Sequence, residues 1–440
     1  MKFNFLFILF FIPAYGIFSG GNDHDEPHLH CTGSVTLKDI VECVIDHSPE
    51  YKSSRLELNV IKGRKIAAGY FFPSNPQVSL MQSYRKQTQN QGEFTGLQSS
   101  VNGEVMLSQE IYIGGQRKGR LDVADKEFAS QVRRVTVMER EMIYNALVAS
   151  LMYFSLIEEL RLSENLYSLA KDIYEVAKAR SEKGLAAPID TDIAEAELVK
   201  MKRFFLLTKR KTELAKGNLT VMMGIPFHAS IELLEKPKNP VFQNMSVDRL
   251  TEEALKVRAE IQASEADILT QDSKITLLKK ETIPNLTISG FLQRDGFNEN
   301  VIGGRLSLPL KIFRDNSGEL LEELSRKQQL INKAEVSRHT IRYEVIKSIS
   351  GYNSLKEEYE SYSEELLQRI DKDLDSIKKA LLNGRINVRE ALMSQQSLIG
   401  TKISYIQSKT DFAIASIEVI RASGIPFTDY LNSESKKEIK

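Results

Sequence analysis

The most regular pattern in the chain is a narrow apolar stripe in two long stretches that lack proline. No proline occurs between Pro76 and Pro188, or between Pro309 and Pro426. Because proline costs about 3 kcal/mol inside a helix, these gaps permit very long helices. Apolar residues in both stretches step by three and four positions, as in a coiled-coil seam. The stripes are Leu162, Leu166, Leu169, Ile173 and Val176, and Leu367, Ile370, Leu374, Ile377 and Leu381.

Each stretch predicts an extended antiparallel helical hairpin. The hairpins span residues 117–224 and 317–424, with long helices over residues 117–183 and 317–383. A helix of 67 residues is roughly 100 Å long. Each long helix should end near Gly184 or Gly384, because glycine readily adopts the left-handed conformation that ends helices. A shorter helix then returns to Gly224 or Gly424. One chain has too little other sequence to cover such hairpins, which implies partner chains.

The two hairpins belong to two copies of one unit. The quartet Met223-Gly224-Ile225-Pro226 recurs as Ser423-Gly424-Ile425-Pro426, at an offset of 200. The same offset relates Gly184 to Gly384 and Asp190 to Glu390, and an offset of 201 relates Ile111-Tyr112 to Ile312-Phe313. The repeats should span residues 35–226 and 248–426, with a linker at 227–247 and a charged C-terminal tail at 427–440.

Ahead of each hairpin the apolar period changes to 2, which predicts strands. The predicted strands are residues 77–84 and 101–113 in the first repeat, and 285–293 and 301–313 in the second. Strands of about ten residues joined by polar loops are typical of transmembrane β-hairpins, although a half-buried soluble hairpin shows the same period. Four strands leave two open edges, which cannot lie in lipid. Three chains would close a barrel of twelve strands, and two chains would close one of eight. The period of the strands does not distinguish these two assemblies.

The N-terminal residues predict export. Residues 1–20 combine Lys2, an apolar run and a small-residue exit, which is typical of a secretory signal peptide. The alternative, a membrane anchor, would need about 20 apolar residues, and no later apolar run approaches that length. A polar, His-rich tail follows at residues 21–34. Export permits a disulfide between Cys31 and Cys43, while lipidation at Cys31 is disfavoured because it lies far from the apolar run.

Composition excludes some classes of protein. The 440 residues contain 59 basic and 59 acidic side chains, so the basic excess of a nucleic-acid-binding protein is absent. Of the six histidines, three cluster in the tail and the other three, His47, His228 and His339, lie far apart, and no phosphate-binding glycine loop or nucleophile elbow occurs. We therefore predict neither an enzyme nor a cofactor. The energy for export through such a protein would have to come from an inner-membrane partner.

Two junctions between strand and helix resemble those of the TolC outer-membrane efflux family. The first is residues 107–117, Leu-Ser-Gln-Glu-Ile-Tyr-Ile-Gly-Gly-Gln-Arg, in which a Gly-Gly-basic step precedes the long helix. The second is residues 309–318, Pro-Leu-Lys-Ile-Phe-Arg-Asp-Asn-Ser-Gly, which is similar to the CzcC-like cation-efflux branch, as is Pro284-Asn285-Leu286-Thr287-Ile288 before it. The resemblance covers essentially the whole mature chain.

This resemblance implies a mostly helical fold with membrane β-strands. Three copies would form a twelve-stranded barrel in the outer membrane, continuous with a helical tunnel through the periplasm. The homotrimer would be the passive exit duct of a tripartite pump. Its other partners would be a periplasmic adaptor protein, outer-membrane lipid and an inner-membrane transporter, of the RND type if the cargo is divalent metal cations.

The resemblance also assigns roles at the hairpin tips. Arg180, Gly184, Leu185, Leu381 and Gly384 would form the periplasmic tip that docks the adaptor. Asp190 and Glu390 would line the pore gate, where symmetry-related carboxylates attract cations. Family members often carry a second acid three residues later, where this chain has Met393, which implies a single acidic ring. The alternative is that Asp190 and Glu390 only complement the dipole of a helix N-terminus.

The polar tail offers a candidate metal site. His24, His28, His30 and Cys31 supply imidazole and thiol groups that could bind a cation such as zinc. The alternative is a solvated N-terminus without a site.

Other functions remain open at this stage. Drug or detergent efflux and type I secretion use ducts of the same fold. A different class, an exported coiled-coil tether with a soluble β cap, would be favoured if the protein were soluble in the periplasm. An exported hydrolase would need a clustered nucleophile and base, which the sequence does not offer.

Overall fold

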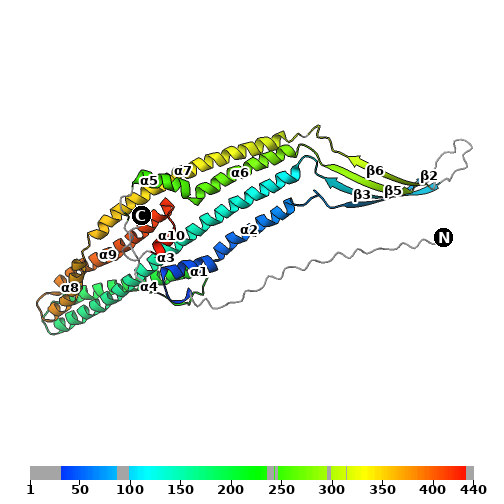
Figure 1. The fold of residues 1–440 in the computed structure, drawn as a ribbon. Coiled ribbons are helices and arrows are strands. Elements are labelled where there is room, and N and C mark those ends of the chain that lie inside the picture. The colour runs from blue at the N-terminus through cyan, green and yellow to red at the C-terminus, as the bar shows by residue number, and fades with distance from the viewer. Residues whose placement is uncertain are drawn as a thin grey trace, which may run out of the picture.

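The computed structural model describes residues 31–86, 99–234, 242, 246–294, 299–313 and 315–432. The molecule is elongated, with helices over most of its length and a sheet at one end (Figure 1). The predicted signal peptide and the residues of the polar tail before Cys31 lie outside the described residues.

The same order of elements occurs twice. The first half contains α1 (Leu37–His47), α2 (Pro49–Ala68), β2 (Gln77–Lys86), β3 (Ser99–Ile111), α3 (Gln116–Glu182) and α4 (Pro188–Met223). The second half contains α5 (Val247–Val257), α6 (Ala259–Lys280), β5 (Leu286–Arg294), β6 (Asn300–Ser307), α7 (Ser317–Glu360), α8 (Glu364–Leu382) and α9 (Val388–Ser423). Each half thus adds two helices before its strands, which the sequence analysis did not anticipate.

The first long helix is continuous and the second is not. Helix α3 has 67 residues, with bounds one residue from those predicted. In the second half, α7 ends at Glu360 and α8 begins at Glu364, where the sequence analysis expected one helix over 317–383. The Ser363 hydroxyl accepts a hydrogen bond from the Leu366 amide at 3.1 Å, so it starts a new helix instead of extending the old one.

Helices α2, α3, α6 and α7 lie side by side in that order (Figure 1). Ion pairs join each neighbouring pair of helices: Lys65–Asp125 at 2.6 Å, Arg134–Asp267 at 2.8 Å and Arg338–Glu265 at 3.1 Å. The strands follow the same order, β2-β3-β5-β6, and all are antiparallel to their neighbours. Each strand therefore continues one column of the helical layer.

The shorter hairpin helices, α4 and α9, complete two of these columns. At the end of α4, the Cα of Gly224 lies so near the His47 carbonyl oxygen that an added Cβ would approach it to 2.7 Å. At the end of α9, a Cβ on Gly424 would approach Val257 to 2.7 Å. Helices α4 and α2 thus meet end to end, as do α9 and α6. The layer has four columns: α2 with α4, then α3, then α6 with α9, then α7 with α8.

The hydrophobic core lies between the columns, midway along the molecule. One cluster joins α3 to α9 through Leu147, Leu151, Phe412 and Ile417. A second joins α1 and α4 to α3. Two further clusters continue along the hairpins toward the tips.

The predicted linker and the predicted charged tail both contribute to this core. In the linker at 227–247, β4 (Ile231–Leu233) pairs in parallel with β1 (Gly33–Val35), and Phe242 is buried against Tyr352. The charged tail at 427–440 begins with α10 (Phe427–Asn432). Its Phe427 and Tyr430 are buried, because apolar side chains just beyond Pro426 reach the α3–α9 cluster.

Candidate functional site

One face of the four-stranded sheet is apolar and exposed. In antiparallel pairs, residues directly opposite share a face, and the register places Leu80 opposite Val105, Val105 opposite Leu292, and Leu292 opposite Ile302. Leu80 is 77% and Ile302 is 81% exposed. Ten exposed apolar residues lie on this face: Val78, Leu80, Tyr84, Val101, Val105, Leu107, Ile288, Leu292, Ile302 and Leu306.

The opposite face of the sheet is mixed and mainly polar. It carries Ser79, Glu104, Gln293 and Arg305, among others. The Arg305 guanidinium lies 5.9 Å from the centre of the Phe291 ring. That ring lies over Gly303, where a Cβ would come within 2.3 Å of it, so a side chain at position 303 would displace the ring. The sheet therefore has one face suited to lipid and one suited to water.

The sheet has two free edges among the described residues. Strand β2 pairs only with β3, and β6 pairs only with β5. Strand β6 ends at Ser307 rather than at residue 313 as expected, because Pro309 has no amide hydrogen to continue the ladder. Apolar side chains nevertheless continue beyond it: Leu310, Ile312 and Phe313 are exposed, Phe313 at 97%.

The two hairpin tips have matching backbone geometry. Gly184 and Gly384 have φ of 74° and 70°, the left-handed conformation that was expected of a helix-ending glycine. The Leu185 amide donates to the Arg180 carbonyl at 2.8 Å, and the Arg385 amide donates to the Ala380 carbonyl at 2.9 Å. The turns are thus the same structure, repeated 200 residues apart.

The tips are packed side by side, which separates the predicted docking residues into two groups. The Arg180 guanidinium donates to the Leu381 carbonyl at 3.1 Å and so joins one tip to the other. Leu185 is 67% exposed, whereas Leu381 is 1% exposed. Leu381 lies in a cluster with Ile173, Ala194, Ile377 and Leu392. Its side chain therefore joins the hairpins and is not available on the surface.

The predicted gate acids both begin a return helix. The Asp190 amide donates to the Ala187 carbonyl at 3.0 Å in the first turn of α4, and the Asp190 side chain is half-buried. Glu390 forms a capping box with Asn387: the Glu390 amide donates to Asn387 Oδ1 at 2.8 Å, and the Asn387 amide donates to Glu390 Oε2 at 3.2 Å. The exposed Glu390 carboxylate thus has a local structural role.

The predicted metal ligands are not assembled in the part of the chain that is described. Cys31 forms a disulfide with Cys43 and is fully buried, so it offers no thiolate to a metal. His24, His28 and His30 lie outside the described residues. Across the described ranges, no group of three or more His, Cys, Asp or Glu side chains could hold a metal ion.

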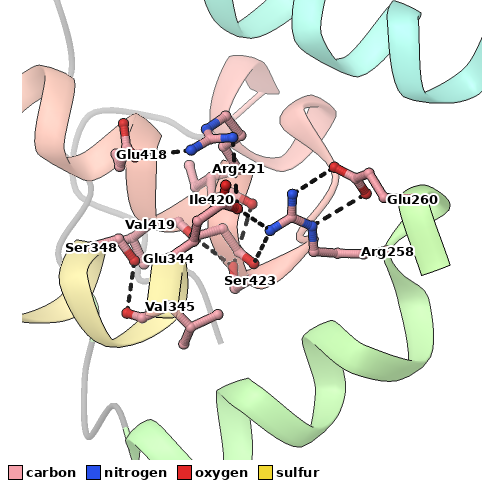
Figure 2. A network of polar contacts seen from close by, with 11 residues as sticks. Arg258, Glu260, Glu344, Val345, Ser348, Glu418, Val419, Ile420, Arg421 and Ser423 are labelled. Carbon is pink, nitrogen blue, oxygen red and sulfur yellow. Dashed lines mark hydrogen bonds and ion pairs between the residues drawn. The ribbon is translucent and has the colours of Figure 1, made fainter. Parts of the chain in front are cut away.

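A buried ionic network near the α5–α6 junction joins α6, α7 and α9 (Figure 2). A contact from Tyr144 on α3 extends it to three of the four columns. Arg258 is 4% exposed and bonds Glu260 on α6 and Glu344 on α7, each at 2.5 Å. Arg421 on α9 bonds Glu418 at 3.0 Å, and Tyr144 on α3 donates to Glu418 at 2.5 Å. Charges this well paired hold the end of α9 against its neighbours.

The network stays charged because its pairing outweighs burial. Burial opposes ionisation of Glu260 and Glu418. Hydrogen bonds to the ionised carboxylates outweigh it: Arg258 donates to Glu260, and Tyr144 and Arg421 donate to Glu418. The pKa of both carboxyl groups is therefore lowered. Sequence reasoning missed this network. The available signal was Arg258 followed by Glu260 at a helix boundary, which is too short a pattern to predict a partner 86 residues away.

One helix of the described chain, α3, is long and apolar enough over part of its length to cross a membrane. No run of that length was predicted after the signal peptide. Because 44% of that part is buried inside the fold, packing in the core explains its composition.

Comparisons with known proteins agree with this architecture. Residues 72–224 match the family model described as outer membrane efflux protein. Those residues include β2, β3, α3 and α4. Comparison with curated proteins finds no matching sequence.

Solved outer-membrane channels share the fold over most of the chain. The CmeC outer membrane channel of Campylobacter jejuni is 16% identical, with 91% of this chain and 87% of that chain covered and a TM-score of 0.70. The outer membrane protein VceC of Vibrio cholerae is 17% identical, with coverages of 88% and 96% and a TM-score of 0.68. CusC is 12% identical, with coverages of 89% and 92% and a TM-score of 0.69.

Proposed function

We propose that this chain is a protomer of an outer-membrane exit duct. Three copies would form a twelve-stranded barrel in the outer membrane and a helical barrel that projects into the periplasm. The duct would be a passive conduit in a tripartite efflux pump. A periplasmic adaptor would dock at the tips, and an inner-membrane transporter would supply the energy.

The observation that carries this proposal is the coincidence of an apolar sheet face with two free edges. Ten apolar side chains exposed on one face, with a polar face behind them, suit strands between lipid and a water-filled lumen. Free edges cannot remain in lipid, since each unpaired backbone group costs several kcal/mol there. The strands and helical columns share one order, so one arrangement of copies would close both layers. A tether with a soluble β cap gives no reason for this apolar face.

Conductance across a planar lipid bilayer tests the proposal. Purified protein should produce discrete, long-lived conductance steps, and the same protein should partition with outer-membrane vesicles after fractionation. Protein that stays in the soluble periplasmic fraction and gives no conductance would favour the tether and refute the duct.

We further propose that Asp190 and Glu390 line the periplasmic gate. Supporting this, both lie in the first turn after a tip, and the Glu390 side chain is exposed. Glu390→Gln is a sharp test because glutamine can also complete a capping box, so the helix end should survive. Cation preference measured from reversal potentials should fall in this variant. Unchanged selectivity would leave Glu390 with its capping role alone.

For the cargo, we propose divalent metal cations delivered by an RND-type transporter. The support is the similarity of residues 309–318 to the cation-efflux branch and the exposed acid at position 390. Growth of a deletion strain on zinc, cobalt, cadmium, copper, drugs and detergents tests this point. Sensitivity confined to metals is expected, whereas sensitivity to drugs or detergents would assign the duct to a different pump.

A further inference from the structure

One face of α4 is exposed over most of its length, apart from Phe227 packed at Gly217, and carries both apolar and basic side chains. At 100° per residue, Arg203 and Arg210 fall on the side of α4 opposite its buried residues. The buried residues include Ala194, Met201, Thr208 and Leu219. The exposed apolar residues on the same free face are Val199, Leu206, Leu214 and Val221.

The middle of α4 has an excess of positive charge. Residues 200–216 contain seven lysine or arginine residues and one acid, Glu213, and of the seven Arg203 and Arg210 lie on the free face. Arg203 and Arg210 are exposed, and neither forms an ion pair with another described residue. Basic side chains interleaved with apolar ones suit a surface that is covered by an acidic partner.

The opposite outer column has a matching excess of negative charge. Residues 357–365 contain Glu357, Glu358, Glu360, Glu364 and Glu365 and no basic residue, and all five carboxylates are exposed. They flank the break between α7 and α8. The nearest cation along the chain, Lys356, lies 3.8 Å from Glu360, which leaves most of this charge uncompensated.

The two charged segments lie at the same level of the molecule. Both hairpins turn at one end (Figure 1), and a helix rises 1.5 Å per residue. From the start of α4, Arg203 is about 22 Å and Arg210 about 33 Å from the tip. From the end of α8, Glu365 is about 26 Å and Glu357 about 38 Å from it. Helix α4 packs on α3, and α8 packs on α9. Helices α4 and α8 therefore lie in the two outer columns, and their charges belong to opposite edges of the helical layer.

We propose that the basic face of α4 in one copy docks on the acidic segment 357–365 of a second copy, and that these charges set the register between copies. This inference rests on the proposed trimer and names the surfaces that build it. A second copy is the occupant because opposite charges stand at equal height on opposite edges of one fold, as a closed head-to-tail ring requires. The apolar stripe would seal the contact, and the charges would disfavour a shifted register.

Charge reversal with rescue tests the proposal on the full chain in detergent. The variant Arg203→Glu with Arg210→Glu places like charges across the contact, and we expect the trimeric fraction at fixed concentration to fall about tenfold or more. Adding Glu357→Lys with Glu360→Lys should restore it to within about twofold. Lysine is also acceptable there because it lies in the last turn of α7, where the helix dipole favours cations.

A matched control separates this surface from charge in general. Lys209→Glu with Lys211→Glu changes the same charge on the same helix, but each position lies 100° from Arg210. The control should keep the trimeric fraction within about twofold of the wild type. Native mass spectrometry gives the fraction, and circular dichroism shows that each variant is folded.

The outcomes distinguish this inference from the proposed duct. A trimer that is insensitive to Arg203→Glu with Arg210→Glu, or that the second pair of substitutions fails to rescue, overturns the charged contact while the duct still stands. A wild-type chain that is monomeric in membranes overturns the duct itself, and the contact with it.

Discussion

The two helical hairpins are built on one plan but contribute differently to the molecule. Helices α4 and α9 both have 36 residues, and both tips turn through a left-handed glycine. Helix α3, however, runs unbroken for 67 residues, whereas its counterpart is divided after Glu360. The break falls opposite residues 160–162 of α3 at the offset of 201.

The difference follows from position in the layer. Helix α3 lies inside the layer and packs on α2, α4, α6 and α9, so many of its residues are buried. Helices α7 and α8 form an outer column that packs mainly on the α6–α9 column and meets α3 near the tips. A break on an edge exposes few apolar groups, whereas a break in α3 would divide the core. The same helical pattern therefore costs less free energy to interrupt in the outer column than in the inner one.

The largest expected effect comes from truncating equivalent leucines in the two hairpins. Leu166 is 2% exposed in a cluster that joins both hairpins, whereas Leu367 is only partly buried. Leu166→Ala should lower the free energy of unfolding by about 3 kcal/mol through lost burial and a cavity. Leu367→Ala should cost about 1 kcal/mol. Urea unfolding followed by helical circular dichroism measures both, and equal losses would contradict the distinction between inner and outer columns.

The next effect compares the two end-to-end helix junctions. Ser48 begins α2 where Arg258 begins α6, and both are buried. Arg258→Ala removes the partner of Glu260 and Glu344 and should cost about 2 kcal/mol, less than for a fully buried pair because both carboxylates are partly exposed. Ser48→Ala should cost less than about 1 kcal/mol. The same urea titration compares them, and a larger loss at Ser48 would show that the ionic network does not stabilise its junction.

A smaller effect should distinguish the two tips. Gly184 and Gly384 share a positive φ, so valine at either position should cost about 1–2 kcal/mol locally. A Cβ at 384 would also lie 3.5 Å from the Arg180 guanidinium, whereas one at 184 meets nothing. Gly384→Val should therefore raise amide exchange more, near residues 380–390. Equal exchange in both variants would remove Arg180 as the link between the tips.

The smallest effect should appear at the helix break. Ser363→Ala removes the hydroxyl that accepts from Leu366 and should cost about 1 kcal/mol. Exchange should increase in the first turn of α8 and remain unchanged in α3. Hydrogen exchange across both hairpins checks this, and faster exchange throughout α3 would mean that the outer column supports the inner one.

The sequence predicted the long-range periodic features well. The bounds of α3, and the left-handed glycines at 184 and 384, follow from proline gaps and glycine positions, which act locally. The alternation in β2 and β3 predicted a sheet with one apolar face, because period 2 assigns every second residue to it. These features needed no knowledge of distant contacts.

Other features depend on contacts between distant segments. Arg258 and Glu344 attract each other only after α6 and α7 are side by side. Leu381 looks like any tip residue until Ile173 and Leu392 surround it. The sequence around residues 361–363 has a favourable helical pattern. Because this column lies at the edge of the layer, interrupting it loses few contacts, and the N-cap at Ser363 is enough to begin a new helix. Helices α1, α2, α5 and α6 were overlooked because their apolar faces are short.

The central claim is that the free edges of this chain are closed by other copies of it. Native mass spectrometry of the protein extracted from outer membranes in mild detergent tests this most directly. We expect one dominant species of three copies. A dominant single copy, with its edges still free, would contradict it.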